Sequence, residues 1–485
     1  MGSVNTSSVR DELKNFETMY AELTKNNTID EQTHCLIKGL FMVLKLVVSV
    51  FMEEQTKKTS KNSSIPSPQT DEDETGLDDT DNKKRRQQRE KSNTHQSDNT
   101  RTVETVTVIE VAHCQHCGES LCDEACIALE RRTMIDIIFE KQITHVDAEI
   151  KSCPSCHQQT KGDHPKTMQG PKQYGLGVKA YIIQMLITQM VSLKRLKKQL
   201  GTLIGEWVSE AVMLKYILQL HHALEPWEEQ ATEEMLLKPA INVDETSLQV
   251  DKKKQWIHGY SSGDITLKFL HKKRGREAMQ AIHIIPRYGG VIIHDCWGSY
   301  LAYEHCLHGL CGSHLLRELT FIIQANDYRW AKNIKILLQE ACRTINRGKK
   351  KKLSKKAYAR LQRCYRNTLT RGKKEMPAII KPRGKKRGRI AKSDAHNLWE
   401  RLKKYESAVL RFALDPNVTF TNNRSERDFR MAKVKQKVSG CFRTEIYAKA
   451  YCRISSYLQT MERKGYSAGI AIQMALTGEL YRLKV

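Results

Sequence analysis

Ile241-Asn242-Val243-Asp244-Glu245-Thr246 opens an alternation of apolar and polar residues that continues to Val250. An alternation of period two is typical of a β-strand with one buried face. Two further runs of this kind follow at residues 256–260 and 265–270, with Ser261-Ser262-Gly263-Asp264 between them. Because these four residues favour a turn, the region is predicted to form an antiparallel meander of three strands.

A fourth strand is predicted at Val291-Ile292-Ile293-His294-Asp295, a continuous apolar run typical of a buried strand. Residues 275–284, before it, are predicted to be helical, and so is the chain from about residue 315 onward. Three strands, a helix and a further strand form the start of a ribonuclease-H-like sheet, in which the first and fourth strands lie side by side. We therefore expect Asp244 and Asp295, each at the end of its run, to meet at one sheet edge.

Carboxylates at such an edge suit a two-metal site, in which cations about 4 Å apart activate a nucleophile and stabilise a leaving oxygen. Mg²⁺, or Mn²⁺, fits because it prefers oxygen ligands and retains water. A third acid is expected at Glu426, in Asn422-Asn423-Arg424-Ser425-Glu426-Arg427. The helix that Glu426 opens is predicted to continue through Arg430 and Lys433, which places these cations and Arg427 beside the metal ligand, where they could hold DNA phosphates.

The alternative for any single acid is a solvated surface residue. Glu245, Asp251 and Asp264 are interpreted as ordinary surface acids. Asp244 and Asp295 are interpreted differently, because strand interiors rarely carry acids without a role.

The charge of the chain indicates a polyanionic partner. Its 485 residues include 80 Lys and Arg against 55 Asp and Glu, for a net charge of +25. Residues 343–392 hold 21 of these cations and one acid, Glu375. The alternative is a solvated loop, but such clustering is typical of a phosphate-contacting surface. The predicted DNA contacts in this basic window are Lys349, Lys350, Lys385, Lys386 and Arg387.

No export signal or membrane span is predicted, because the most apolar run, residues 41–51, is short and contains Lys45. That run is interpreted as a packed helix face. Fourteen cysteines without an export signal indicate a reducing compartment, in which cysteines are metal ligands or small buried residues.

Two cysteine pairs predict a structural zinc site. Cys114 and Cys117 form one Cys-x-x-Cys knuckle, and Cys153 and Cys156 form a second. Two knuckles supply four thiolates for one tetrahedral Zn²⁺. The alternative is two pairs of unligated buried cysteines, and the neighbours are taken as non-ligands: His113, His116, Cys122, Cys126 and His157.

A second group, His305, His308, Cys311 and His314, has spacing that permits metal binding. The preferred interpretation is that Cys311 and His314 orient the catalytic edge through hydrogen bonds.

Residues 193–218 resemble a helix-turn-helix, with Gly201 and Gly205 in the turn and Ser209 capping the second helix. The equally weighted alternative is a plain helical hairpin. The cations that would face the DNA backbone are Lys194, Arg195, Lys197 and Lys198.

The predicted organisation is α/β, with a ribonuclease-H-like catalytic core that carries a helical insertion, preceded by a small zinc-binding module and a helical DNA-binding region. Composition sets the boundaries, because residues 59–105 are almost devoid of apolar side chains and are predicted to be a disordered linker. The segments are 1–58 helical, 59–105 linker, 106–165 zinc module, 166–238 DNA-binding, 239–440 catalytic with a basic insertion at about 315–415, and 441–485 helical.

The chain resembles transposases of the insertion sequence 66 family, a bacterial group with an Asp-Asp-Glu catalytic core. The likeness spans roughly residues 106 to 475, whereas residues 1–105 match poorly. It rests on the order and spacing of these blocks: Gln173-Tyr174-Gly175, Val243-Asp244-Glu245-Thr246, His294-Asp295-Cys296-Trp297-Gly298-Ser299-Tyr300 with Leu310-Cys311-Gly312-Ser313-His314, Asn422-Asn423 with Glu426-Arg427, and the cysteine module.

The resemblance implies that Asp244, Asp295 and Glu426 are the catalytic acids and hold two Mg²⁺ or Mn²⁺ ions. The 131-residue step from Asp295 to Glu426 fits the helical insertion of such enzymes. Implied partners are double-stranded DNA at the element ends and target, further copies of the chain on that DNA, and element-encoded accessory proteins. The implied location is the cytoplasm, at the bacterial nucleoid, with no membrane partner.

Two other functions stay open at this point. One is a zinc-containing DNA-binding protein that derives from a transposase and has lost catalysis, which the presence of all three acids opposes. The other is a ribonuclease-H-fold nuclease that cuts DNA without rejoining it, which only a strand-transfer assay separates from a transposase.

Overall fold

The computed structural model describes residues 6–25, 30–56, 58, 62, 105–135, 139–165, 168, 170–379 and 392–480. The predicted linker therefore lies outside the described residues, apart from Asn62 and Thr105, as do residues 380–391 of the basic window. The chain forms two compact units. The first comprises Met1–Arg89, Leu224–Arg463 and Arg482–Val485, and the second comprises Glu90–Ala223 and Lys464–Tyr481. The domain boundaries drawn from the sequence remain predictions.

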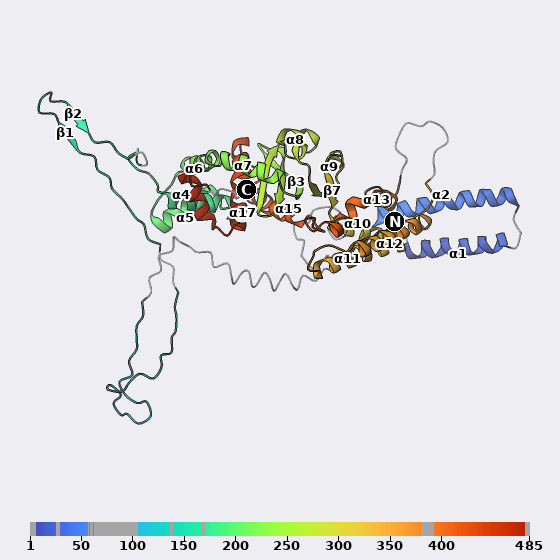
Figure 1. Ribbon diagram of the computed structural model, residues 1–485, viewed down its shortest axis with the longest axis horizontal. Coiled ribbons are helices and arrows are strands. Elements are labelled where there is room, and N and C mark those ends of the chain that lie inside the picture. The colour runs from blue at the N-terminus through green and yellow to red at the C-terminus, as the bar shows by residue number, and fades with distance from the viewer. Residues whose placement is uncertain are drawn as a thin grey trace, which may run out of the picture. The chain divides into compact units, whose positions relative to one another are not determined.

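Among the described residues, a five-stranded sheet forms the centre of the first unit (Figure 1), in the order β5-β4-β3-β6-β7. The strands are β3 at Ala240–Val250, β4 at Lys253–Ser262, β5 at Ile265–His271, β6 at Val291–His294 and β7 at Leu307–Leu310. The first three pair antiparallel, which confirms the predicted meander. Asp251 and Lys252 join β3 to β4 with φ of 48° and 58°, because a two-residue turn of type I′ needs positive φ at both positions.

Strand β6 pairs parallel with β3, as predicted for the first and fourth strands. The register joins Ala240 to Val291, Ile241 to Ile292 and Asn242 to Ile293. Asp295 follows directly after β6, but Asp244 lies inside β3. The prediction that Asp244 ends its strand is therefore wrong, because pairing with β4 extends β3 as far as Val250.

Helices of the first unit cover the sheet. Helix α17, Glu445–Arg463, packs along β5, and α7, Glu225–Leu236, contacts both. The Trp227 ring meets Tyr457 edge-on at 5.1 Å between centroids. The predicted helix before β6 is confirmed as α8, Arg276–Ile282. A short helical turn, η2 at Ile285–Arg287, lies between α8 and β6, and the short helix α9 at Gly298–Leu301 follows β6.

The expected helical region after β7 is also confirmed. Its helices share an apolar core that includes Trp330, Leu338 and Tyr365 and reaches Val291 and Ile293 of β6. They are α10 at Gly312–Asn326, α11 at Arg329–Arg347, α12 at Lys355–Glu375, α13 at Asp394–Lys404 and α14 at Glu406–Leu414. Two further helices, α15 at Asn423–Asp428 and α16 at Arg430–Ser439, follow this core in the sequence and contribute no residue to it.

The two ends of the helical insertion are bonded to each other. The Gly312 amide donates to the Phe420 carbonyl at 2.7 Å, and the Asn422 amide donates to Cys311 Sγ at 3.1 Å. A Cβ at Gly312 would lie 2.3 Å from the Phe420 ring, so the close approach depends on glycine. The chain thus leaves the sheet after β7 and returns to the same place before α15.

The N-terminal helices α1, Thr6–Lys25, and α2, Glu31–Gln55, form a hairpin (Figure 1), in which the Tyr20 hydroxyl and His34 Nδ1 are 2.9 Å apart. The interpretation of residues 41–51 as a packed face holds only for part of that run, since Met42, Val43, Leu44, Val47 and Phe51 are exposed, whereas the other residues are half-buried or buried. Helix α2 also contacts α10, where Ser49 Oγ donates to Asn326 Oδ1 at 3.3 Å. By length and composition Glu31–Glu54 could cross a membrane, a property that it shares with core helices of soluble proteins and with signal sequences.

The second unit contains a helical group and a small hairpin. Helices α4 at Leu176–Ile187, α6 at Glu210–Ala223 and α18 at Ala468–Thr477 pack together, and α5 at Leu193–Ile204 packs on α4 and α6. Helix α5 ends at Gly205, whose φ is 68°. Strands β1 at Ile150–Ser152 and β2 at Gln159–Lys161 pair antiparallel.

Candidate active site in the sheet unit

One cavity of about 1130 Å³ collects the three predicted catalytic acids. They arrive from β3, from the end of β6 and from α15, segments that are far apart in the sequence. Cations and polar groups surround them. The residues that line the cavity include Lys58, Asn62, Asp244, Glu245, Trp256, Arg274, Asp295, His314, Arg317, Arg401, Glu426, Arg430, Lys433 and Lys437.

Each aspartate accepts a hydrogen bond from a backbone amide one or two residues later in the chain. The Glu245 amide donates to Asp244 Oδ1 at 2.8 Å, and the Trp297 amide donates to Asp295 Oδ1 at 3.0 Å. Burial, reinforced by the charges of Glu245, Asp295 and Glu426, raises the pKa of Asp244 well above its usual range. Burial also raises the pKa of Asp295 and of Glu426. Gathering these acids without a cation therefore costs free energy that a bound divalent ion would offset.

Asn422 fixes the segment that carries Glu426. Its side chain is 1% exposed, donates to the Val243 carbonyl at 2.8 Å, and accepts from Asn242 Nδ2 at 2.8 Å. Next to it, Ser313 Oγ donates to Asn423 Oδ1 at 3.2 Å. The paired asparagines thus join α15 to the strand of Asp244 and to α10.

The predicted continuous helix from Glu426 through Lys433 is broken at Phe429, between α15 and α16. At the break, the Phe429 ring lies against β4, since a Cβ at Gly259 would lie 2.4 Å from it. Phe429 therefore packs directly on the sheet, and a residue larger than glycine at position 259 would clash with its ring. Arg430 and Lys433 line the cavity with Glu426, whereas Arg427 is exposed and does not line it.

Glu245 is a functional candidate that sequence reasoning missed. It was interpreted as a surface acid, which is wrong, because its side chain is 1% exposed. It accepts from the Tyr300 hydroxyl at 2.6 Å and from Arg274 Nε at 2.7 Å. The Arg274 guanidinium also lies over the Trp256 and Trp297 rings, at 5.0 and 4.3 Å. The sequence separates these partners too widely for spacing to reveal them.

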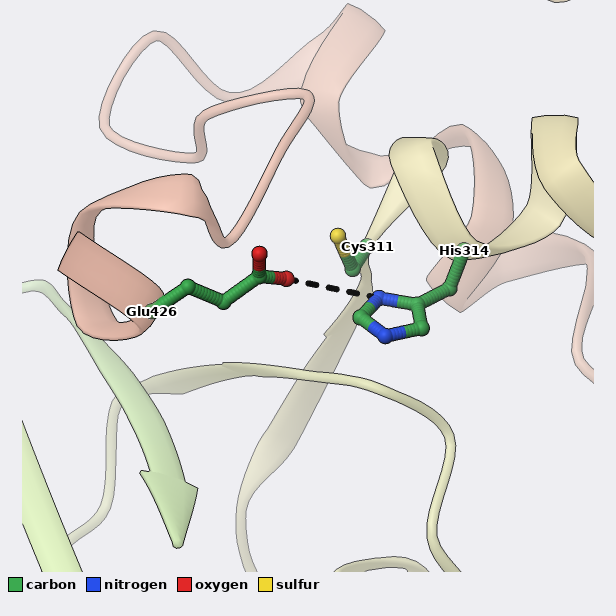
Figure 2. Close-up of side chains that lie close together, drawn as sticks. All are labelled: Cys311, His314 and Glu426. Carbon is green, nitrogen blue, oxygen red and sulfur yellow. Dashed lines mark ion pairs between the residues drawn. The ribbon is translucent and has the colours of Figure 1, made fainter. Parts of the chain in front are cut away.

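The predicted group of four His and Cys residues divides into two sets. His308 Nδ1 lies 3.1 Å from His294 Nε2, and His305 Nε2 lies 3.1 Å from the Ile285 carbonyl. Cys311 and His314 instead lie beside Glu426 (Figure 2), with ligand atoms that all fall within 4.8 Å of one another. Burial lowers the pKa of His314 to about 3 and raises the pKa of Cys311 to about 11.

Each cysteine knuckle of the second unit has the same backbone geometry. Cys114 and Cys153 each donate an amide to the carbonyl five residues later and accept one from the residue four later. That fourth residue, Gly118 in one knuckle and His157 in the other, has positive φ in both, 80° and 59°. The free thiol of Cys114 interacts with that of Cys117, and the free thiol of Cys153 interacts with that of Cys156. Among the described residues, the four thiols do not come together within 4.8 Å of one another.

The predicted DNA-contacting cations are partly described. In α5, Lys194, Arg195 and Lys198 are exposed and Lys197 is half-buried, while Leu196 and Leu200 face the core. Lys349 and Lys350 are exposed between α11 and α12. Lys385, Lys386 and Arg387 lie outside the described residues.

Comparisons with known proteins place the chain in a family. No curated protein matches it. The family model of the IS66 transposases matches residues 172–450, more than half of the chain, including the segments that supply Asp244, Asp295 and Glu426. The chain belongs to the IS66 transposase family.

Proposed function

We propose that this transposase cleaves DNA strands and joins them to a target, using two Mg²⁺ or Mn²⁺ ions held by Asp244, Asp295 and Glu426. The observation that carries the proposal is that these acids, from three distant segments, line one cavity together with Arg317, Arg401, Arg430 and Lys433. Acids for metal ions beside cations for phosphates are what phosphoryl transfer on DNA requires.

The residues present fit the proposed ions. Carboxylate oxygens are the ligands that Mg²⁺ prefers, and the cavity leaves room for water and a phosphate. Glu426 Oε1 is buried and has no hydrogen-bond partner among the described residues, so a cation could take it as a ligand. When bound, the ions would polarise the phosphate and lower the pKa of a bound water.

A ribonuclease-H-like core is part of the same proposal. The strand order β5-β4-β3-β6-β7, with three antiparallel strands followed by two parallel ones, supports it. The helical insertion between β7 and α15 fits the long step before the third acid.

The chain's own residues would position DNA around this site. Arg430, Lys433 and Lys437 follow Glu426 on the cavity wall and are exposed, so they could hold the strand backbone. Asn422 and Asn423 would keep Glu426 at a fixed distance from Asp244, because they bond to β3 and α10.

We further propose that Cys114, Cys117, Cys153 and Cys156 bind one structural Zn²⁺, which the matching backbone of the two knuckles supports. This module and α5 with α6 would recognise the element ends, and the basic window would grip phosphates. The assembly on DNA would contain further copies of the chain and element-encoded accessory proteins, in the cytoplasm at the nucleoid.

A strand-transfer assay on the full-length protein tests the catalytic proposal. The substrate is a duplex that carries an element end with its flanking DNA, with a target plasmid and Mg²⁺. Asp244→Asn, Asp295→Asn and Glu426→Gln should each lose cleaved and joined products while still binding the duplex. Asp251→Asn is the matched control, because this acid lies in the exposed β3–β4 turn outside the cavity, and it should stay active.

Other outcomes would contradict the proposal. Cleaved ends without joined products from the unaltered protein would indicate a nuclease. Binding without cleavage would indicate a protein that has lost catalysis. Normal cleavage by Asp295→Asn would remove that acid from the site.

A further inference from the structure

The start of α10 places a thiol and an imidazole against the third acid of the cavity. Cys311 precedes α10, His314 lies in its first turn, and Glu426 comes from α15 (Figure 2). His314 Nδ1 and Glu426 Oε1 lie 3.8 Å apart, and the Cys311 sulfur lies within 4.8 Å of both. The three side chains converge on one point, from two elements that the insertion separates in the sequence.

Two atoms of this group are buried without a partner. His314 Nδ1 and Glu426 Oε1 have no hydrogen-bond partner among the described residues, although the His314 side chain is 12% exposed. Leaving a buried polar atom unpaired costs about 1–3 kcal/mol. The pair faces each other across a gap that is too wide for a direct hydrogen bond. A group that both atoms can bind would remove this cost.

We propose that Cys311, His314 and Glu426 form a site for a thiophilic divalent cation, Zn²⁺ in preference to Mg²⁺. The site is separate from the four-cysteine module. It shares the ligand Glu426 with the proposed site for the two catalytic ions. Sulfur, nitrogen and oxygen donors together favour Zn²⁺, whereas Mg²⁺ takes oxygen ligands.

The distances fit such an ion after a small closure. Ligands on a tetrahedral Zn²⁺ at about 2.0–2.1 Å from nitrogen and oxygen lie about 3.3 Å apart, against the 3.8 Å between His314 and Glu426. The Asn422 amide, which donates to Cys311 Sγ at 3.1 Å, would hold the sulfur in place and stabilise its thiolate form. Binding would release the thiol proton to solvent.

The fourth ligand would come from the cavity. His314 and Glu426 both line it, whereas Cys311 lies behind them. An ion with three protein ligands and one position open to water or a phosphate oxygen has the coordination of an exchangeable site. Its occupancy would also engage the carboxylate of Glu426. If Glu426 holds a catalytic ion, a consequence that rests on the proposed function, Zn²⁺ here would inhibit strand cleavage.

Cobalt titration of the metal-free full-length protein tests the site directly, since Co²⁺ bound to a thiolate gives a charge-transfer absorption. The unaltered protein is compared with Cys311→Ala and with Cys306→Ala, a matched control whose buried thiol faces the Tyr288 carbonyl instead. We expect Cys311→Ala to bind one fewer equivalent of Co²⁺ and to lose part of the absorption. Cys306→Ala should behave as the unaltered protein.

A second variant keeps the test decisive if Cys311→Ala unfolds. His314→Asn retains the thiol, and we expect its Co²⁺ affinity at this site to fall at least tenfold while the four-cysteine module is unaffected. Equal stoichiometry and equal spectra for the unaltered protein, Cys311→Ala and His314→Asn would overturn the proposal. Because the readout is spectroscopic, an absence of strand cleavage in Mg²⁺ would count against the proposed function alone.

Zinc sensitivity provides the second measurement. Adding a low concentration of Zn²⁺ should lower the cleavage rate of the unaltered protein at least tenfold. The same addition should lower the cleavage rate of Cys311→Ala much less. An equal fall in both would show that zinc inhibits elsewhere and would remove the inhibitory consequence.

Discussion

Asp244 precedes Asp295 by 51 residues, and the same offset relates every residue pair in the parallel register of β3 and β6. Ala240 pairs with Val291 and Asn242 with Ile293, so the two aspartates lie at the same level just beyond the paired segment. Neighbouring strands are about 4.8 Å apart, and equal levels in parallel strands put side chains on the same face. The sheet itself thus sets the separation of the two aspartates.

Lengthening either aspartate should therefore impair catalysis without removing the charge. We expect Asp244→Glu and Asp295→Glu to lower the cleavage rate at least 100-fold, because a displacement of about 1 Å is enough for such a loss. Duplex affinity should be unchanged within about twofold. Single-turnover cleavage and a binding titration measure the two effects, and a near-normal rate in either variant would show that the register does not set the ligand position.

Asn422→Ala should uncouple α15 from β3. The change leaves the Val243 carbonyl and the Asn242 side chain without their bonded partner in a buried place, which we expect to cost about 2–3 kcal/mol of unfolding free energy. Cleavage should fall further than this loss explains, since Glu426 would no longer be held. Urea denaturation and cleavage rates check both. Asn417→Ala, at an exposed residue that bonds to Asp415, should change neither.

Glu245 and Arg274 should behave as a coupled pair. We expect Arg274→Ala to cost about 2–3 kcal/mol of unfolding free energy, because it leaves a buried carboxylate without its cation. Combining it with Glu245→Gln should cost less than the sum of the single changes. A double-mutant cycle by urea denaturation measures the coupling. The exposed pair Arg287 and Glu233 is the control and should couple by less than about 1 kcal/mol. If the losses of unfolding free energy at Glu245 and Arg274 were additive, the ion pair would not contribute to stability.

The basic window should add DNA affinity without sequence preference. Replacing the exposed Lys349, Lys350, Lys351 and Lys352 with Gln should weaken specific and random duplexes alike. The log-log slope of affinity against salt should fall by about 0.9 for each DNA phosphate that the variant no longer neutralises. Lys14→Gln with Lys25→Gln, in α1, controls for charge alone. An unchanged slope would place the window away from DNA, and a selective loss for element ends would mean that it reads sequence.

Short-range patterns predicted the parts of the fold that depend on neighbours in the sequence. Alternation located β3, and the turn residues located the meander, because both reflect local pairing. Asp244, Asp295 and Glu426 could be nominated from their blocks, and the structure gathers them in one cavity. Partners from distant segments could not be found in this way. The burial of Glu245 depends on Arg274 and Tyr300, 29 and 55 residues away.

The packing of Phe429 shows the same limit, because its ring lies against Gly259, 170 residues earlier in the sequence. The alternation placed the end of strand β3 correctly, at Val250, but Asp244 was wrongly placed at that end and lies inside the strand. Its second half is stabilised by β4 beyond the point where β6 ends.

The bonded ends of the helical insertion bear on how this enzyme can change over generations. Because Gly312 and Cys311 bond to Phe420 and Asn422, the insertion departs from and returns to one point. The entropy of closing such an excursion grows only slowly with its length, by about 0.6 kcal/mol per doubling. Whole helices could therefore be gained, lost or exchanged between these ends while Glu426 stays beside Asp244. Descendants could acquire new surfaces here without rebuilding the cavity that holds Asp244, Asp295 and Glu426.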